Sequence, residues 1–348
     1  MEQRFMPRGG AHFSSEELAQ VLSHYSVGVI HHVKHLTAGS KRAPKMVIIS
    51  EQGKFLLKRR PKGKDDLYRV NFAHAVQTHL ASKDFPVTNL VATRDQNDTV
   101  LQLNHHIYEL FQFVTGYRYD GSAEATIDTG RQLARFHQHL TDFANQSNLP
   151  KGSFHDSNIV RRHLRTTGTQ KGVTPAKKLQ QTAEALMVLY NASSVRVSEL
   201  GFDSWPQQIV HGDWHPGNML FNEGKLTAVL DFDSVKVAAR VTDLANGMLQ
   251  FSIVGDRPNP ADWPDYLDQA KLVQFLDGYR QVIDLQGDRF DSLFDLMIET
   301  MIAEAILPVA ATGFFGHLSG LEFLRMIQRK AEWIDTSRDK LAQAIRHQ

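Results

Sequence analysis

Cysteine is absent from this chain of 348 residues, and its absence excludes several kinds of site. Without thiols there is no disulfide framework, no zinc–thiolate site and no cysteine nucleophile. Long apolar runs are missing too: the longest charge-free apolar stretch, residues 305–316, spans 12 residues, whereas a membrane-spanning helix needs about 18. The first five residues contain no apolar segment of the kind found in secretory signals. We therefore expect a cytoplasmic protein with no membrane partner.

An excess of charge of either sign is also absent. Lys and Arg number 39 and Asp and Glu number 38, so the net charge is +1, and we expect no nucleic-acid partner. Hydrophobic residues make up 42% of the chain, close to the globular average, which excludes a disordered or fibrous protein. The length predicts about two domains. Oligomeric state cannot be read from these features.

The pattern of expected elements changes after the first third of the chain. Extended segments dominate at first, with hairpins over residues 45–60 and 99–114. Helical spacing dominates afterwards, apart from a short β section over 208–232. Strands followed by helices are typical of α+β proteins. We therefore predict a bilobal α+β fold, with a small β-rich lobe over 1–114 and a larger, mainly helical lobe over 115–348.

The most informative segment is residues 209–233. A strand leads into a tight His-Gly-Asp turn, Asn218 follows Asp213 by five residues, and a later apolar strand ends in Asp231. Strand ends would thus direct an amide and carboxylates into one pocket. Mg²⁺ prefers hard oxygen ligands, which Asn218 and Asp231 offer. Asp213 is suited to orient an attacking hydroxyl and take its proton, so the pattern favours phosphoryl transfer.

These two motifs resemble those of aminoglycoside phosphotransferases and choline kinase-like enzymes, which share the protein-kinase-like fold. They are also similar to type II homoserine kinase-like and spore-coat-like kinases. The matching residues are His-Gly-Asp-x-x-x-x-Asn at 211–218 and the apolar strand that ends in Asp231. The resemblance implies ATP- and Mg²⁺-dependent transfer of the γ-phosphate to a hydroxyl, with Asp213 as the base and Asn218 and Asp231 as metal ligands.

Other residues of this region are candidates for the substrate side of the site. His215 lies two residues after Asp213, and Asp233 lies two residues after Asp231. We expect both on the substrate side of the site, with a second metal ligand or a local hydrogen-bonding role as the alternatives for Asp233.

Weaker matches concern the nucleotide. Residues Gly39 and Ser40 fall between strands, as a phosphate-covering loop would. The segment that contains Phe111, Gln112 and Phe113 looks like the last small-lobe strand running into the hinge, where backbone groups of such kinases bind adenine. These side chains do not distinguish ATP from GTP.

Lys58 matches the lysine that such kinases pair with the nucleotide phosphates. That lysine usually contacts a glutamate on the small-lobe helix, but residues 52–108 contain no Glu. His74 lies close to where it would be. Asp65, Asp66, a phosphate or nothing would then hold Lys58.

We expect a small molecule, not a protein, as the acceptor. Protein kinases place a long activation segment after the metal-binding Asp, whereas here an Asp-Leu-Ala helix start at Asp243 follows Asp231 by only 12 residues. The helical pattern over 290–307 presents acidic residues that would form a face toward a cationic acceptor or a solvent-exposed face. These residues are Asp291, Asp295, Glu299 and Glu304.

Three alternatives remain at this stage. An atypical Ser/Thr protein kinase and a nucleotide-binding pseudokinase share the motifs, and the missing helix glutamate is compatible with the pseudokinase. A metallohydrolase would use His211, Asp213 and His215 to activate water on a metal, but it leaves Asn218 and the strand before Asp231 unexplained.

Residues 157–183 form a basic segment with six Lys and Arg residues and no acidic residue. Such a segment is either a solvated insertion or a mobile lid or docking surface for an anionic partner.

Overall fold

The computed structural model describes residues 12–36, 43–143, 149–168, 176–255, 257–285 and 287–346. Its contacts divide the chain into two compact units. Unit 1 comprises Met1–Tyr117, Phe143–Asn145 and Thr227–Asp233, and unit 2 comprises Arg118–Asp142, Gln146–Leu226 and Ser234–Gln348. The sequence predicted one division of the chain, between residues 114 and 115. It did not predict that the later segment Thr227–Asp233 belongs to unit 1.

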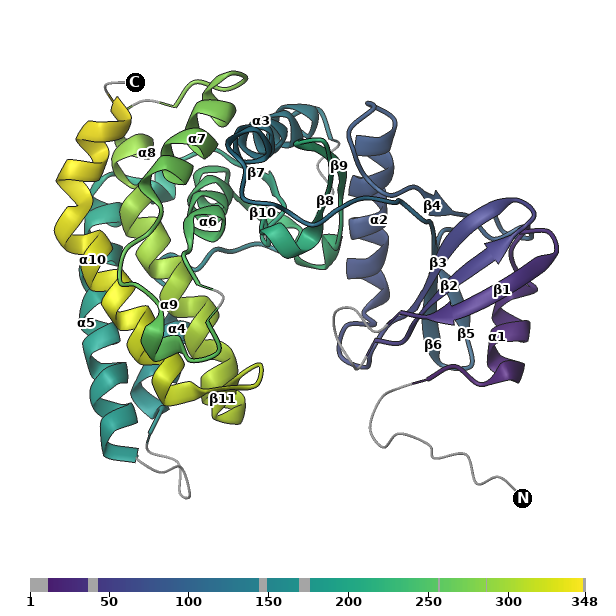
Figure 1. The fold of residues 1–348 in the computed structure, drawn as a ribbon, viewed down its shortest axis with the longest axis horizontal. Coiled ribbons are helices and arrows are strands. Elements are labelled where there is room, and N and C mark those ends of the chain that lie inside the picture. Colours follow the sequence, from purple (N-terminus) through teal and green to yellow (C-terminus); the bar gives the residue numbers. More distant parts are fainter. Residues whose placement is uncertain are drawn as a thin grey trace. The chain divides into compact units, whose positions relative to one another are not determined.

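Unit 1 is built on an antiparallel sheet in the order β1-β2-β3-β6-β4, with β5 also paired to β6. Its strands are β1 (Ile30–His35), β2 (Lys45–Ser50), β3 (Gly53–Arg59), β4 (Leu90–Val91), β5 (Leu101–Leu103) and β6 (His106–Gln112). The helices are α1 (Ser15–Leu22) and α2 (Leu67–Ala81), and Figure 1 shows α1 beside the strands. Both hairpins expected from the sequence are present.

The core of unit 1 lies between α1 and the sheet. Val21 of α1 packs in one apolar cluster with Ile48 of β2, Leu57 of β3 and Leu110 of β6, all of them inaccessible to solvent. A capping box at Ser14 and Glu17 begins α1, because each residue bonds a backbone N–H that the first turn leaves without a partner.

Unit 2 is mainly helical. Its helices are α3 (Ala123–His139), α4 (Asn158–Thr166), α5 (Ala176–Glu199), α6 (Val241–Ser252), α7 (Gln269–Arg280), α8 (Asp288–Asp291), α9 (Leu293–Thr312) and α10 (Gly320–Arg346). Figure 1 shows α5, α9 and α10 side by side, and α9 also contacts α6. Because α9 has neighbours on several sides, it is apolar around most of its circumference, whereas α10 is amphipathic.

Short strands interrupt the helices. In antiparallel pairs, β7 (Gln207–Val210) joins β10 (Lys236–Ala239) and β11 (Phe314–Phe315) joins β12 (Leu318–Ser319), while β8 (Met219–Asn222) forms a two-stranded sheet with β9 (Lys225–Val229). The sequence analysis did not anticipate α4, β4, β10, β11 or β12. The expected order of strands and then helices is confirmed, and with it the α+β class. No helix of the described segments is long and apolar enough to cross a bilayer.

Two glycines set the distance between α3 and α7. A Cβ on Gly130 would lie 1.9 Å from the backbone oxygen of Phe275, and one on Gly278 would lie 1.9 Å from that of Ile127. Real side chains cannot approach so closely, so each glycine lets the other helix's backbone come into contact. This pair supports α6, which carries residues of the candidate site.

The basic segment falls on α4 and the start of α5, and its residues 169–175 lie outside the described part. Arg161 forms an ion pair with Asp156 and donates a hydrogen bond to Asn191, so it has a structural role. The expectation of a lid or docking surface is not tested by these contacts.

Candidate active site

The His-Gly-Asp turn follows β7 directly, and its backbone conformation requires glycine. Gly212 has φ +75°, and a Cβ there would lie 2.6 Å from the backbone oxygen of Ser234. A larger residue would therefore be strained in its backbone and would also clash.

Asp243, in the first turn of α6, anchors this turn. Its Oδ2 accepts a hydrogen bond from the His211 N–H at 2.6 Å and its Oδ1 accepts one from the Gly212 N–H at 2.8 Å. His137 Nε2 of α3 lies 3.3 Å from Oδ2. Burial alone would raise the pKa of Asp243, but the hydrogen bond and charge of His137 and the backbone donor lower it overall. A buried carboxylate thus fixes the backbone just before Asp213.

Asp213 and Asn218 are brought together as the sequence predicted. The Asn218 amide nitrogen donates to Asp213 Oδ2 at 2.9 Å and to the Asp213 backbone oxygen at 3.1 Å. His215 accepts a hydrogen bond from the Gly217 N–H at Nδ1, and its Nε2 lies 3.6 Å from Asp213 Oδ2. Burial raises the pKa of Asp213, but the contacts with His215 and Asn218 lower it overall, so the carboxylate stays ionised at neutral pH.

The donor set fits a hard divalent cation. Because the Asn218 amide nitrogen is committed to Asp213, its Oδ1 is the atom left to act as a ligand. Asp231 is an exposed carboxylate of unit 1 with φ +58°. Within the described segments no group of three or more His, Cys, Asp and Glu side chains is placed to hold a metal. Mg²⁺ takes one or two protein ligands and completes its shell with water and phosphate oxygens, so Asn218 Oδ1 and the Asp231 carboxylate are donors of the right type.

The surroundings of His211 do not favour the metallohydrolase alternative. His211 is fully buried, and its ring packs against those of Phe136 and Trp214, with centroids 5.9 and 5.5 Å away. It therefore does not form a metal cluster with Asp213 and His215.

Lys58, on β3, lies between two carboxylates of unit 1. Its Nζ is 3.5 Å from Asp233 Oδ1 and 3.9 Å from Glu109 Oε2. The expectation of Asp65, of Asp66 or of no partner for Lys58 is therefore wrong: the protein partners are Asp233 and Glu109, and Asp66 instead caps α2. A phosphate as a partner of Lys58 is not tested by these contacts. Sequence spacing gave no signal for Glu109, because only the pairing of β3 with β6 brings the two residues together.

Asp233 belongs to the same cluster. Arg60 Nη2 lies 2.8 Å from its Oδ1, and Lys64 Nζ lies 3.7 Å from its Oδ2. Burial raises the pKa of Asp233, but the charges of Lys58 and Arg60 lower it overall. Cations contact both oxygens of Asp233, and these contacts do not test its expected substrate-side role.

The predicted adenine-binding segment forms the end of β6. The Gln112 N–H donates to the Asn89 backbone oxygen, and the Phe113 N–H donates to that of Lys54, each at 2.8 Å. Phe111 pairs with Leu56 of β3. A base bound here would have to use backbone groups other than those two N–H groups. Gly39 and Ser40 lie outside the described residues.

Unit 2 contains a cavity of about 580 Å³ that His215 lines. Aromatic walls are supplied by Tyr119, Phe251, Trp263, Phe315 and Phe323. Glu304 of α9 also lines it, and its two carboxylate oxygens accept hydrogen bonds from Asn246 at 2.8 Å and Gln250 at 2.6 Å, both on α6. Burial and the charge of Asp213 raise the pKa of Glu304 to about 7.

The other carboxylates of the predicted acidic face do not accompany Glu304. Asp295 is buried and accepts hydrogen bonds from Arg196 and Arg338, and Glu299 is buried beside His155. Asp291 pairs with Arg346. The expectation of a single face toward solvent or an acceptor is therefore wrong, because arginines from α5 and α10 and the side chain of His155 bind three of the four residues.

One wall of the cavity depends on a buried lysine. Lys330 of α10 is inaccessible to solvent, and its Nζ donates to the backbone oxygens of Val254, Pro264 and Tyr266 at 3.2, 2.6 and 3.2 Å. Burial lowers the pKa of Lys330 to about 8. The three bonds fix the segment between α6 and α7 against α10.

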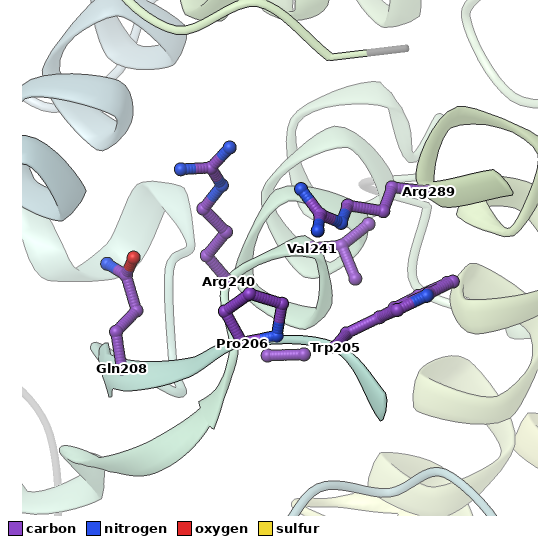
Figure 2. A pocket seen from close by; sticks show the side chains of 7 residues that line it. Trp205, Pro206, Gln208, Arg240, Val241 and Arg289 are labelled. Carbon is purple, nitrogen blue, oxygen red and sulfur yellow. The ribbon is translucent and has the colours of Figure 1, made fainter. Parts of the chain in front are cut away.

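A second, much smaller cavity of about 70 Å³ also lies in unit 2. Figure 2 shows the side chains of Arg240 and Arg289 at its edge, above Trp205 and Pro206. Its lining includes none of the residues predicted to take part in catalysis, so we assign it no part in the reaction.

Comparison with known proteins identifies a family and a fold for this chain. The model of a family described as the phosphotransferase enzyme family matches residues 35–284. No curated protein matches the chain. Similar solved structures include an amicoumacin kinase in complex with AMP-PNP and Ca²⁺, at 13% identity and a TM-score of 0.67 over 93% of this chain and 94% of that chain.

Two further structures are similar over most of their length. A microcompartment-associated aminopropanol kinase has 14% identity and a TM-score of 0.69, over 94% of this chain and 99% of its own. A choline kinase from Cryptosporidium parvum has 14% identity and a TM-score of 0.58, over 90% and 91%. These likenesses confirm the predicted protein-kinase-like fold.

Proposed function

Since this chain belongs to the phosphotransferase enzyme family, we propose that it transfers the γ-phosphate of ATP to a hydroxyl of a small molecule. The observation that carries the proposal is the geometry of the His-Gly-Asp turn and the residue after it (residues 211–214, named the reaction turn): Asp243 fixes its backbone, and Asn218 orients the Asp213 carboxylate by a bond of 2.9 Å. A preorganised carboxylate beside an amide oxygen is what hydroxyl activation next to a metal-bound phosphate requires.

In the proposed reaction, Asp213 holds the acceptor hydroxyl and takes its proton. The hydroxyl oxygen forms a bond to the γ-phosphorus, the bond from that phosphorus to the bridging β–γ oxygen breaks, and ADP leaves. Asn218 keeps the Asp213 carboxylate in one orientation. In such a reaction the protein acts chiefly by positioning the reacting groups and neutralising their charge.

We assign Mg²⁺ to Asn218 Oδ1 and Asp231. When bound, the ion neutralises the charge of the nucleotide phosphates. Lys58, on β3, supplies a further positive charge for the phosphates. The end of β6 remains the proposed binding place of the adenine ring.

The acceptor is proposed to occupy the cavity lined by His215 and Glu304. Glu304 is the one member of the predicted acidic set that lines this cavity, and the amides of Asn246 and Gln250 hold its carboxylate still. Aromatic walls next to a fixed carboxylate favour an acceptor with an amine as well as a hydroxyl, such as an amino alcohol or amino sugar.

A coupled assay of ADP release tests the function. Purified protein with Mg²⁺ and ATP is given amino alcohols, amino acids, sugars, aminoglycosides and a generic protein substrate, and products are identified by mass spectrometry. We expect a phosphate ester of at least one amine-containing alcohol. Phosphorylation of the protein substrate alone would favour the protein kinase alternative, and nucleotide binding without any turnover would favour a pseudokinase.

A further inference from the structure

Glu109 is a buried carboxylate that reaches Lys58 from a strand. The two residues lie directly opposite each other in the β3–β6 pair, so their side chains share one face of the sheet. The Glu109 side chain is only 1% exposed. Burial raises its pKa, but the hydrogen bond with His74 and the charges of Lys58 and Arg60 lower it to about 2. Glu109 is therefore ionised at neutral pH.

The two oxygens of Glu109 have different surroundings. Oε1 lies 2.8 Å from Arg60 Nη2 and 2.7 Å from His74 Nε2, and both nitrogens donate because an ionised carboxylate only accepts. His74 is itself held by Thr99, 2.8 Å from its Nδ1. These contacts fix the carboxylate from α2 and from the end of β3.

The second oxygen, Oε2, faces Lys58. It is buried and has no hydrogen-bond partner within the part of unit 1 that the structure describes, and Lys58 Nζ is 3.9 Å away. A buried carboxylate oxygen without a donor is unfavourable. The ammonium group needs to move by only about 1 Å to donate to it.

Lys45 adds a reason for that movement. It lies opposite Lys58 on the other neighbouring strand, β2, and burial and the charge of Lys58 both lower its pKa. Repulsion between the two ammonium groups favours movement of Lys58 away from Lys45 and toward Glu109, which lies on the opposite neighbouring strand.

We propose that Glu109 is the positioning residue that directs Lys58 to the nucleotide phosphates, and that His74 of α2 acts by holding Glu109. The inference rests on the proposed function, in which Lys58 contacts those phosphates. A carboxylate on a strand then takes the role that a helix glutamate was expected to have, which is to pair with the lysine. Helix α2 contributes the hydrogen bond from His74 to that carboxylate and does not supply the carboxylate itself.

A double-mutant cycle tests this inference. Calorimetry measures the Kd of Mg·ATP for the wild type, Glu109→Gln, Lys58→Met and the double variant. Charged hydrogen bonds of this kind are worth roughly 10- to 100-fold in affinity, so we expect Glu109→Gln to raise the Kd and the KM for ATP by about that factor. The KM for the acceptor should not change. In the Lys58→Met background, Glu109→Gln should have little further effect.

Glu17→Gln is the matched control. Glu17 forms an ion pair of 2.5 Å with Arg59, the neighbour of Lys58 on β3, so its loss removes a comparable pair that does not involve Lys58. Circular dichroism and thermal unfolding report whether each variant folds. If Glu109→Gln does not fold, Glu109→Asp, which keeps the charge but shortens the reach, replaces it in the same cycle.

The outcomes separate the inference from the proposed function. Unchanged Mg·ATP affinity in the folded Glu109 variant, or an equal loss in the Lys58→Met background, would overturn the positioning role. A wild-type protein that binds no Mg·ATP would overturn the proposed function itself. If Glu17→Gln also lost affinity for Mg·ATP, the loss in Glu109→Gln would reflect a general disturbance of the sheet. That result would likewise contradict the inference.

Discussion

Asn246 and Glu304 are joined by a hydrogen bond of 2.8 Å from the Asn246 amide to Glu304 Oε1. The other end of the same amide accepts a hydrogen bond from the Trp214 N–H at 3.1 Å. One side chain therefore links the reaction turn, next to Asp213, to the carboxyl that lines the proposed acceptor cavity.

The first prediction concerns pH. Burial and the charge of Asp213 raise the pKa of Glu304 to about 7, so Glu304 is neutral below that pH and negative above it. The KM for an acceptor whose amine stays protonated should therefore fall as the pH rises through about 7, by roughly tenfold for a charged hydrogen bond. Steady-state kinetics from pH 6 to 8.5 measures this.

Glu304→Gln keeps the shape of the side chain but cannot ionise. Its KM for the same acceptor should stay high and lose its dependence on pH near 7. KM is the informative parameter, because the proposed contact between Glu304 and the amine acts on binding of the acceptor. A wild-type profile retained in Glu304→Gln would contradict contact between this carboxyl and the amine.

The second prediction concerns the proposed base. Asp213→Asn should fold normally and bind Mg·ATP, but it lacks the carboxylate that takes the hydroxyl proton. We expect turnover to fall by more than about 10²-fold, the lower range for an acid–base group. Asp203→Asn, at an exposed position, should turn over normally. Near-normal activity of Asp213→Asn on the identified acceptor would exclude the assignment.

The third prediction concerns the metal. Asp231→Ala and Asn218→Ala should each reduce the enhancement of ATP binding by Mg²⁺, because each removes an oxygen ligand. Calorimetry with and without Mg²⁺ compares them with Asn222→Ala, which removes an exposed amide from β8. If both variants kept the wild-type enhancement, the ion would have to bind elsewhere.

The fourth prediction concerns stability. Asp243→Ala leaves two backbone N–H groups and His137 without their buried acceptor, and the free energy of unfolding should fall by about 3–5 kcal/mol. Urea unfolding measures it, with Asp203→Ala as an exposed control that should change by less than about 0.5 kcal/mol. An equal change in both variants would show that Asp243 is not an anchor.

The same residue predicts acid sensitivity. The folded-state pKa of Asp243 is lowered, so its contribution is fully present above the pKa of an unfolded Asp, about 3.9. It is lost as the pH falls through the lower folded value. Wild-type stability should therefore decline below about pH 4 more steeply than that of Asp243→Ala, as urea midpoints over pH 2.5–6 would show.

The sequence was sufficient for the features that local pattern determines. The hairpin over 45–60 follows from alternation and a glycine turn, and the spacing of Asp213 and Asn218 correctly predicted that they lie together. Local pattern did not reveal β10, because four residues carry little periodicity.

Residues that meet through tertiary contacts were not predictable. Glu109 lies 51 positions from Lys58 and meets it only through strand register. Glu304 and Asp295 share one helix and look alike in sequence. Arginines from α5 and α10 neutralise Asp295, whereas amides from α6 hold Glu304 in the cavity wall.

Asp243 and Asn246 stand three residues apart on α6 and so occupy one face of that helix. Between them they hold the backbone of His211, Gly212 and Trp214. A single face of α6 thus fixes the backbone geometry of the reaction turn. Much of the cavity wall comes from other elements, namely α9, α10 and the segment before α7. Under the proposed function, substitutions in those elements would alter acceptor preference while the turn proposed to perform the chemistry stays unchanged.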